Sequence, residues 1–374
     1  MRLIRYIHPI GQGAFYTEQF FDDDNKKIAT VVYDCGVQNN KTVIRREVSE
    51  MFREGDDVDI LFVSHFHEDH INGIAKLKEL TNIKNVIIPH YENDLQKLLL
   101  VTLRPRDDED KLDSLIEQPE SFFSSTTRVV RVKTFNGGMN MNSKPIIIDE
   151  LNNKTIESGT SITTSSLCKL NSFWEYIPYN HKYDERIVVL AKYLEITPRE
   201  LICGIGDTDL QSKLKNIYRK IIVKESINAH SMMVYSGQYL EAANNVTDLP
   251  NGCLYTGDAT FNEATTQRLL EHLGNRCSNM IMLQVPHHGS GHSFHDTIFN
   301  ILKNNSTYPI LFLSCGKDNS YGHPSPFVIT NCNLFLNSLK CLPILYDKSQ
   351  REQDVRIVCE DKSSMLVLIF DLNH

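Results

Sequence analysis

The sequence lacks the features that mark membrane and secreted proteins. It contains no apolar run of about 18 residues, so we expect no transmembrane helix and no membrane partner. The first residues, MRLIRYIHPIGQG, include no long apolar stretch, so no signal peptide is expected. The nine cysteines are scattered singly without a CxxC pair, which indicates reduced thiols rather than a disulfide framework. We therefore expect a cytoplasmic protein.

No strong excess of charge points to a particular partner. Over 374 residues the net charge is −8, and the hydrophobic and charged fractions, 41% and 23%, are ordinary for a globular protein. The negative balance provides no general attraction to nucleic acid or to an anionic membrane, although it does not exclude a local basic patch. The length suits one large domain or two small ones.

One short segment concentrates residues that bind metal ions. Residues 63–73 read VSHFHEDHING and follow an apolar run that predicts a buried strand. The segment holds four potential ligands: His65, His67, Asp69 and His70. Imidazole and carboxylate are the usual non-thiolate ligands of zinc and similar ions. Ligands two residues apart can point to one side of an extended loop, so His65 and His67 would serve one ion and the next two ligands a second.

Polar turns after later apolar runs offer further ligands. Asp258 directly follows an apolar run and could bridge both ions. His230 lies 28 residues before Asp258, a separation that a hairpin can close, and could join the first ion. His323 lies in a later turn and could complete the second ion. A pair of histidines, His287 and His288, lies in another such turn.

The order of predicted elements favours a layered α/β architecture. Apolar, β-rich runs at 28–33, 58–63 and 86–89 enclose a stretch of helical composition at 72–80. Strand-like runs return after about residue 227. Alternating buried strands and helices are typical of α/β folds with helices packed on sheets.

The middle of the chain has a different character. Residues 96–225 include acidic and polar stretches, and a capping box with proline at Thr197–Glu200 opens a region of helical periodicity. We expect this segment to be a mainly helical insertion that carries substrate specificity or forms a lid. It would separate two halves of one domain, residues 1–95 and 226–374.

The ligand motifs resemble those of the metallo-β-lactamase superfamily. The family signature S/T-H-x-H-x-D-H stands here at residues 64–70, and the preceding Asp-x-Gly turn stands at 34–36. Three later positions match the family's further ligands in order: His230, Asp258 and His323. The resemblance covers about residues 1–95 and 226–374. It implies a four-layer αββα sandwich and suggests that Asp34 orients the histidine loop, although a plain turn explains Asp34 equally well.

Within that superfamily the sequence is most similar to the nuclease-like domains of DNA-uptake (competence) proteins. Three runs carry this similarity: GQG at 11–13, PHHGS at 286–290 and SCGKDNSYGHP at 314–324. Two features depart from those domains. Ala14 and Phe15 replace the usual acidic residue after GQG, and His230 stands where asparagine is usual. The second departure favours a fuller set of metal ligands here.

The resemblance implies a hydrolase. Water bound between two metals can become hydroxide near neutral pH and attack a phosphorus or carbonyl centre. Phosphodiesterases and tRNA-maturing ribonucleases of the superfamily carry an extra histidine between the bridging aspartate and the last ligand, whereas thioester and lactone hydrolases generally lack it. The pair at 287–288 therefore favours phosphodiester cleavage, as by a nuclease, with a nucleic acid or nucleotide as the expected substrate.

These arguments assign a role to each candidate residue. One ion would be bound by His65, His67 and His230, and the other by Asp69, His70 and His323, with Asp258 bridging. Asp69 and either His287 or His288 would act in catalysis, the histidine as general acid toward the leaving group. Two divalent ions are expected, with zinc as the first choice and manganese or iron compatible. The alternatives are a thioester or lactone hydrolase, or a metal-binding module gated by a protein partner through residues 96–225.

Overall fold

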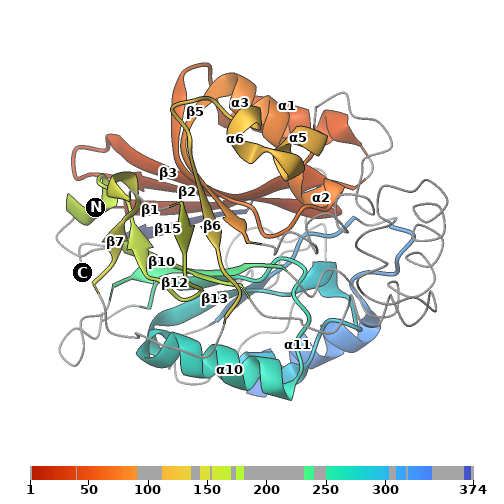
Figure 1. Ribbon diagram of the computed structural model, residues 1–374. Coiled ribbons are helices and arrows are strands. Elements are labelled where there is room, and N and C mark those ends of the chain that lie inside the picture. The colour runs from red at the N-terminus through yellow and green to blue at the C-terminus, as the bar shows by residue number, and fades with distance from the viewer. Residues whose placement is uncertain are drawn as a thin grey trace, which may run out of the picture.

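The computed structural model is described over most of the chain. The described residues are 2–38, 40–90, 112–135, 144–151, 154–169, 174–180, 231–239, 250–302, 309–316, 319–338 and 366–371. Within these ranges the chain forms two β-sheets that face each other, with helices on both outer sides (Figure 1). None of the helices in these ranges has the length and apolar character needed to span a bilayer.

The first sheet has eight strands in the order β15-β1-β2-β3-β4-β5-β6-β8. Its strands are β1 (Arg2–Ile7), β2 (Gly13–Phe21), β3 (Lys27–Val37), β4 (Asp56–Phe62), β5 (Thr81–Pro89), β6 (Arg128–Val132), β8 (Thr155–Ile156) and β15 (Leu366–Asp371). Pairing is antiparallel from β15 to β3 and parallel from β3 to β8. The run Val58–Phe62 of β4 is buried throughout, as expected for a parallel strand covered on both faces.

The second sheet has seven strands in the order β14-β13-β12-β11-β10-β9-β7. Its strands are β7 (Ile146–Ile147), β9 (Ile162–Thr163), β10 (Trp174–Tyr179), β11 (Met233–Gln238), β12 (Gly252–Tyr255), β13 (Met280–Gln284) and β14 (Ile310–Phe312). The predicted pairing of β11 with β12 is confirmed and is antiparallel. Because β12, β13 and β14 run parallel, the turns that follow them lie at one edge of the sheet.

Helices cover the outer face of each sheet (Figure 1). Over the first sheet lie α1 (Lys41–Met51), α2 (Glu68–Ile71), α3 (Ile74–Leu80), α5 (Leu112–Glu117) and α6 (Pro119–Phe122). Over the second lie α10 (Glu263–Leu273) and α11 (Pro326–Ser338). Short 3₁₀ turns are η1 (Ile148–Glu150), η2 (Leu167–Lys169), η5 (Gly274–Asn279), η6 (His287–Gly289) and η7 (Asp296–Ile301).

Three apolar clusters hold these four layers together. One lies between the first sheet and its helices, and a second lies between the second sheet and its helices. The third fills the space between the sheets and is rich in large aromatic side chains, including Trp174 and Tyr176. Three buried apolar interfaces correspond to four stacked layers. The αββα sandwich expected from the sequence is confirmed.

Part of the segment predicted as an insertion contributes strands to both sheets. Between residues 128 and 179, β6 and β8 extend the first sheet and β7, β9 and β10 extend the second. All six residues of β10 are buried, because this strand has neighbours on both sides and the aromatic core beneath it. In the described part of residues 96–225, strand residues therefore outnumber α-helical residues. The helices predicted after Thr197 lie outside the described residues, and a role in substrate specificity stays a prediction.

Candidate metal centre

The histidine loop begins where β4 ends, and Asp34 of β3 holds it in place. The backbone N–H of Ser64 donates to Asp34 Oδ1 at 2.7 Å, and the Ser64 hydroxyl donates to Asp34 Oδ2 at 2.6 Å. A Cβ on Gly36 would lie 2.5 Å from the backbone nitrogen of His70, so only glycine allows this approach of loop and strand. The orienting role suggested for Asp34 is confirmed by these contacts.

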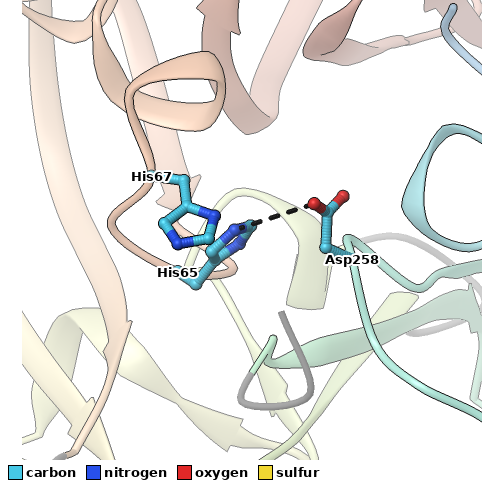
Figure 2. Close-up of side chains that lie close together, drawn as sticks. All are labelled: His65, His67 and Asp258. Atoms are coloured by element: carbon cyan, nitrogen blue, oxygen red, sulfur yellow. Dashed lines mark ion pairs between the residues drawn. The ribbon is translucent and has the colours of Figure 1, made fainter. Parts of the chain in front are cut away.

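The first group of potential ligands consists of His65, His67 and Asp258. One ligand atom from each lies within 4.8 Å of the others. Figure 2 shows the two imidazoles on the loop after β4 and Asp258 facing them from the turn after β12. His65 Nε2 lies 4.0 Å from Asp258 Oδ2. This spacing leaves room for an ion between the side chains.

The second group consists of Asp69, His70 and His288, which meet the same 4.8 Å limit. His288 Nε2 lies 3.4 Å from Asp69 Oδ2. Asp258 also faces this group, because its Oδ1 lies 3.2 Å from His70 Nε2 and 3.4 Å from His288 Nε2. One carboxylate therefore presents one oxygen to each group, which is the arrangement expected of a bridging residue.

Hydrogen bonds to Nδ1 fix the tautomers of three of these histidines. The carbonyl oxygen of Ser314 can only accept, so His288 Nδ1, at 2.8 Å, must donate. His70 Nδ1 lies 2.8 Å from Asp34 Oδ2 and also donates. The Ser64 hydroxyl gives its proton to Asp34, so at 2.9 Å it accepts from Nδ1 of His65. Each ring thus carries a proton on Nδ1 and directs Nε2 inward, the nitrogen that such oriented histidines present to a metal.

Buried carboxylates dominate the charge of this centre. Burial by itself would raise the pKa of Asp69 and Asp258, but adjacent imidazoles hold the pKa of Asp69 at about 2 and that of Asp258 well below its usual range. Burial by itself would lower the pKa of His70, but Asp258, Asp34 and Asp69 raise it well above its ordinary value. The centre therefore favours added positive charge, which a divalent cation can supply.

The same atoms lack hydrogen-bond partners within the described residues. These buried atoms are Nε2 of His65, His70 and His288 and Oδ1 of Asp258. Buried polar atoms are normally paired, so a cluster of unpaired imidazole nitrogens and a carboxylate oxygen fits metal ligation. Imidazole nitrogens and carboxylate oxygens form a donor set suited to zinc, manganese or iron. The residues present therefore fit divalent metal ions.

The structure assembles most of the predicted site residues, with one exchange. Six lie in the two groups: His65, His67, Asp69, His70, His288 and Asp258. His323, predicted in the second group, is in neither, and its ring centroid lies 5.6 Å from that of His287. His288 takes its place, because a positive φ of 53° and the bond to Ser314 turn its ring inward. His230 lies outside the described residues.

His287 differs from the three oriented histidines. Its Nδ1 lies 2.7 Å from the Ser293 hydroxyl, which itself accepts from Thr260 at 3.3 Å and can give its own proton to the ring. Nε2 of the ring lies 3.5 Å from Asp258 Oδ2. The side chain is 17% exposed, and burial lowers its pKa to about 4. His287 thus presents a neutral imidazole beside the shared carboxylate.

Several contributors were not found from the sequence. Ser231 accepts a hydrogen bond from the backbone N–H of Asp258 at 3.0 Å and lies 3.1 Å from His65 Nδ1. Its position next to His230 was the only available signal. Ser314 acts through its backbone carbonyl, and a carbonyl group has no sequence signature. Ser64 is part of the signature, but its bond to Asp34 depends on the pairing of β3 with β4.

Two facing sheets between helical layers, with histidines and aspartates in the turns after β4, β12 and β13, define a metallo-β-lactamase fold. This is a fold of metal-dependent hydrolases and binds divalent metals, often zinc. The sequence model of the metallo-beta-lactamase superfamily matches residues 28–143, which supports that superfamily. The match ends before Asp258 and His288, so the assignment of these two residues to the centre depends on the geometry of the structure.

Solved structures provide looser comparisons. The Zn²⁺-bound PqqB of Methylobacterium extorquens is 6% identical, with full coverage of both chains and a TM-score of 0.41. The metallo-β-lactamase MIM-1 of Novosphingobium pentaromativorans is 11% identical, covers 90% of this chain and 89% of its own, and has a TM-score of 0.29. MEM-A1, a subclass B3 enzyme from a soil metagenome, is 12% identical, covers 90% and 83%, and has a TM-score of 0.30.

No curated protein matches the sequence. Such low identities and TM-scores transfer no activity to this chain. The comparisons reported above do not single out the nuclease-like domains of competence proteins within the superfamily. The closer similarity of this chain to those domains therefore stays a prediction.

Proposed function

We propose that the protein is a dinuclear metal-dependent hydrolase that cleaves phosphodiester bonds in a nucleic acid or nucleotide. The observation that carries this proposal is the position of His287. Its Nε2 lies 3.5 Å from the shared carboxylate of Asp258, next to both ligand groups but in neither of them. A hydrogen-bond donor at this point suits the extra oxygens of a phosphate better than the single oxygen of a carbonyl group.

The two ligand groups divide the proposed ions between them. His65, His67 and Asp258 would hold one ion, with His230 as a proposed further ligand. Asp69, His70 and His288 would hold the other, and Asp258 would contact both. When bound, two ions held by these residues would supply an activated water and charge neutralisation at the phosphate. The residues of the chain set the separation of the ions and orient the ligands.

His287 is the proposed partner of the phosphate. With the Ser293 hydroxyl donating to Nδ1, the imidazole proton would lie on Nε2, and the neutral ring would donate a hydrogen bond to a phosphate oxygen. The pKa of about 4 leaves the ring neutral before substrate binds, and the negative charge of the phosphate would raise that pKa toward protonation. The ring could then give its proton to the leaving oxygen. His288 is not available for this step, because it is 3% exposed and its Nε2 faces Asp69 and Asp258.

His323 would support the same end of the substrate. Its ring lies beside that of His287, and burial lowers its pKa. The ring of Tyr321 stacks on it with centroids 6.1 Å apart. We therefore place the leaving group of the substrate on the side of the centre formed by these residues.

The test is a substrate screen with a matched pair of variants. The protein is loaded in turn with zinc, manganese and iron and assayed against single- and double-stranded DNA, RNA, cyclic dinucleotides, bis(p-nitrophenyl) phosphate, a thioester and a lactone. His287→Ala should lower phosphodiester cleavage about 100-fold or more. His295→Asn is the control, because His295 is 44% exposed outside the centre and asparagine can still cap η7.

The pattern of activity decides between the candidates. Cleavage of phosphodiesters that depends on His287 supports the proposal. Cleavage of the thioester or lactone without phosphodiester cleavage, unaffected by His287→Ala, would establish the carboxylic ester alternative instead. Metal binding without any hydrolysis would favour a module that a protein partner activates.

A further inference from the structure

Gln284, the last residue of β13, holds the turn that carries Asp258. Its side chain is 2% exposed, and its Oε1 accepts hydrogen bonds from the backbone N–H groups of Thr256 at 2.9 Å and Gly257 at 3.1 Å. The Thr256 hydroxyl also donates to the backbone carbonyl of Gln284 at 3.1 Å. The path of the chain just before Asp258 therefore depends on one amide side chain from the neighbouring strand.

Tyr16 connects this amide to the turn that orients His288. It comes from β2 of the opposite sheet and is 1% exposed. Its hydroxyl accepts from Gln284 Nε2 at 3.4 Å and shares a hydrogen bond with the hydroxyl of Ser314 at 2.6 Å. The carbonyl of Ser314 accepts from His288 Nδ1 at 2.8 Å. A continuous buried chain thus links Asp258 to His288 through a residue of the other sheet.

We infer that Gln284, Tyr16 and Ser314 are positioning residues that set the placement of Asp258 relative to His288 and thereby tune metal affinity. None of the three side chains belongs to a ligand group. Asp258 Oδ1 and His288 Nε2 lie 3.4 Å apart, so a small shift of either turn changes the space between them. Residues that hydrogen-bond to the metal ligands, without contacting the metal themselves, typically contribute about 10- to 100-fold to metal affinity. The inference rests on the proposed metal site.

Tyr16→Phe removes one hydroxyl oxygen from the chain, and Gln284→Leu removes its amide. The matched control is Tyr176→Phe. Tyr176 is also 1% exposed between the sheets, but its hydroxyl donates to the Glu18 carboxylate at 2.7 Å rather than to a residue of the turns that carry Asp258 and His288. Loss of a buried hydroxyl partner should lower thermal stability in both tyrosine variants. Only the positioning role predicts a difference between them in metal binding.

The experiment is a titration of the metal-free full chain with cobalt(II), followed by visible absorption and by competition with a chelator. Thermal unfolding of the metal-free protein is measured in parallel. Tyr16→Phe and Gln284→Leu should weaken one of the two cobalt affinities by about 10- to 100-fold and change its absorption spectrum. Tyr176→Phe should lower the unfolding temperature while its cobalt affinity and spectrum stay as in the wild type.

Each other outcome overturns one specific claim. Wild-type cobalt affinity and spectrum in Tyr16→Phe would overturn the positioning inference and leave the metal site intact. Equal loss of cobalt in Tyr16→Phe and Tyr176→Phe would also overturn it, because general destabilisation would then explain both. If the wild type binds no cobalt, the proposed metal site itself is wrong. Should Gln284→Leu fail to fold, Tyr16→Phe still decides the question.

Discussion

His70 donates a hydrogen bond from Nδ1 to Asp34 Oδ2 over 2.8 Å, and both side chains are completely buried. The bond joins the histidine loop to the middle of β3 and leaves the Nε2 lone pair of His70 directed toward Asp258. A carboxylate that also binds Ser64 twice has no freedom to rotate away. The tautomer of one proposed metal ligand is therefore set by a residue 36 positions earlier in the chain.

Asp34→Asn should remove the hydrogen bond that keeps the His70 proton on Nδ1. Asparagine can accept from Ser64 with its oxygen, but its NH₂ group would then face His70 Nδ1 and move the imidazole proton to Nε2. We expect metal affinity to fall about 10- to 100-fold, measured by competition with a chromophoric chelator. Asp59→Asn is the control, because Asp59 is equally buried in the same sheet but binds Thr30 and Lys84 instead. Unchanged affinity in Asp34→Asn would contradict the orienting role.

Removal of Asp258, the proposed shared ligand, should affect the binding of both ions. Removal of a ligand that belongs to only one group should affect the binding of one ion. We expect Asp258→Ala to lose both metals, and His67→Ala to lose chiefly the ion of its own group. Metal content per chain, measured by elemental analysis after gel filtration, distinguishes these cases. If Asp258→Ala and His67→Ala each kept full metal content, the assignment of the two groups would be wrong.

Metal removal should also destabilise the folded protein. A ligand that binds only the folded chain stabilises it by about 2.7 kcal/mol at a free concentration of 100 times its Kd. The ion would relieve repulsion among the buried carboxylates of Asp34, Asp69 and Asp258. We therefore expect a chelator to lower the unfolding temperature at neutral pH, and expect added zinc to restore it. Insensitivity of the unfolding temperature to zinc and chelator would count against a metal at this centre.

Acid should weaken the fold through a buried histidine far from the ligand groups. Burial and, to a lesser extent, Arg276 lower the pKa of His272 to about 4. The unfolded residue titrates near 6.5, so between these values the unfolded chain binds a proton that the folded chain rejects. Stability contributed by the neutral ring is thus present above about pH 6.5 and is lost as the pH falls, by about 2 kcal/mol at pH ~5.

His272→Leu should make the unfolding free energy less sensitive to acid. The slope between pH ~7 and ~5, measured by urea unfolding, should become smaller but not vanish, because burial also lowers the pKa of His8 to about 3. The exposed variant His295→Asn serves as control and should keep the wild-type slope. An identical slope in His272→Leu would show that His272 takes up its proton at the same pH in the folded and the unfolded chain.

The interface between the sheets should be sensitive to the loss of a single charge. Glu18 is 2% exposed and accepts hydrogen bonds from Arg5 at 2.7 Å and from the hydroxyls of Tyr176, Tyr255 and Ser236. Glu18→Ala would leave the Arg5 guanidinium buried without its carboxylate, at a cost of about 3–5 kcal/mol in unfolding free energy. Urea unfolding of Glu18→Ala beside the double variant Arg5→Met/Glu18→Leu tests this, since the double variant should recover most of the loss.

The sequence predicted best those parts of the fold that local pattern determines. The apolar run before Ser64 is β4, and the helical stretch after it contains α3, because both patterns are local. The strand at Trp174–Tyr179 was not predicted as part of the sandwich. All its side chains are buried, so it shows no alternation, and its partners β9 and β11 lie on either side of it in the chain.

The candidate site shows the same limit. The cluster His65 to His70 could be recognised from its composition. The order of residues in the chain could not show which of His288 and His323 joins the second ligand group. That choice depends on a left-handed backbone conformation at His288 and on the carbonyl of Ser314, which pairs with it across 26 residues. Neither feature leaves a side-chain signal in the sequence.

The most direct test of a dinuclear phosphodiesterase is hydrolysis of bis(p-nitrophenyl) phosphate by metal-free protein as zinc or manganese is added in known equivalents. Activity should rise until two ions are bound per chain, and Asp258→Ala should remain inactive throughout. Full activity with one ion per chain would contradict the dinuclear site, and absence of phosphodiester cleavage with both ions bound would contradict the proposed reaction.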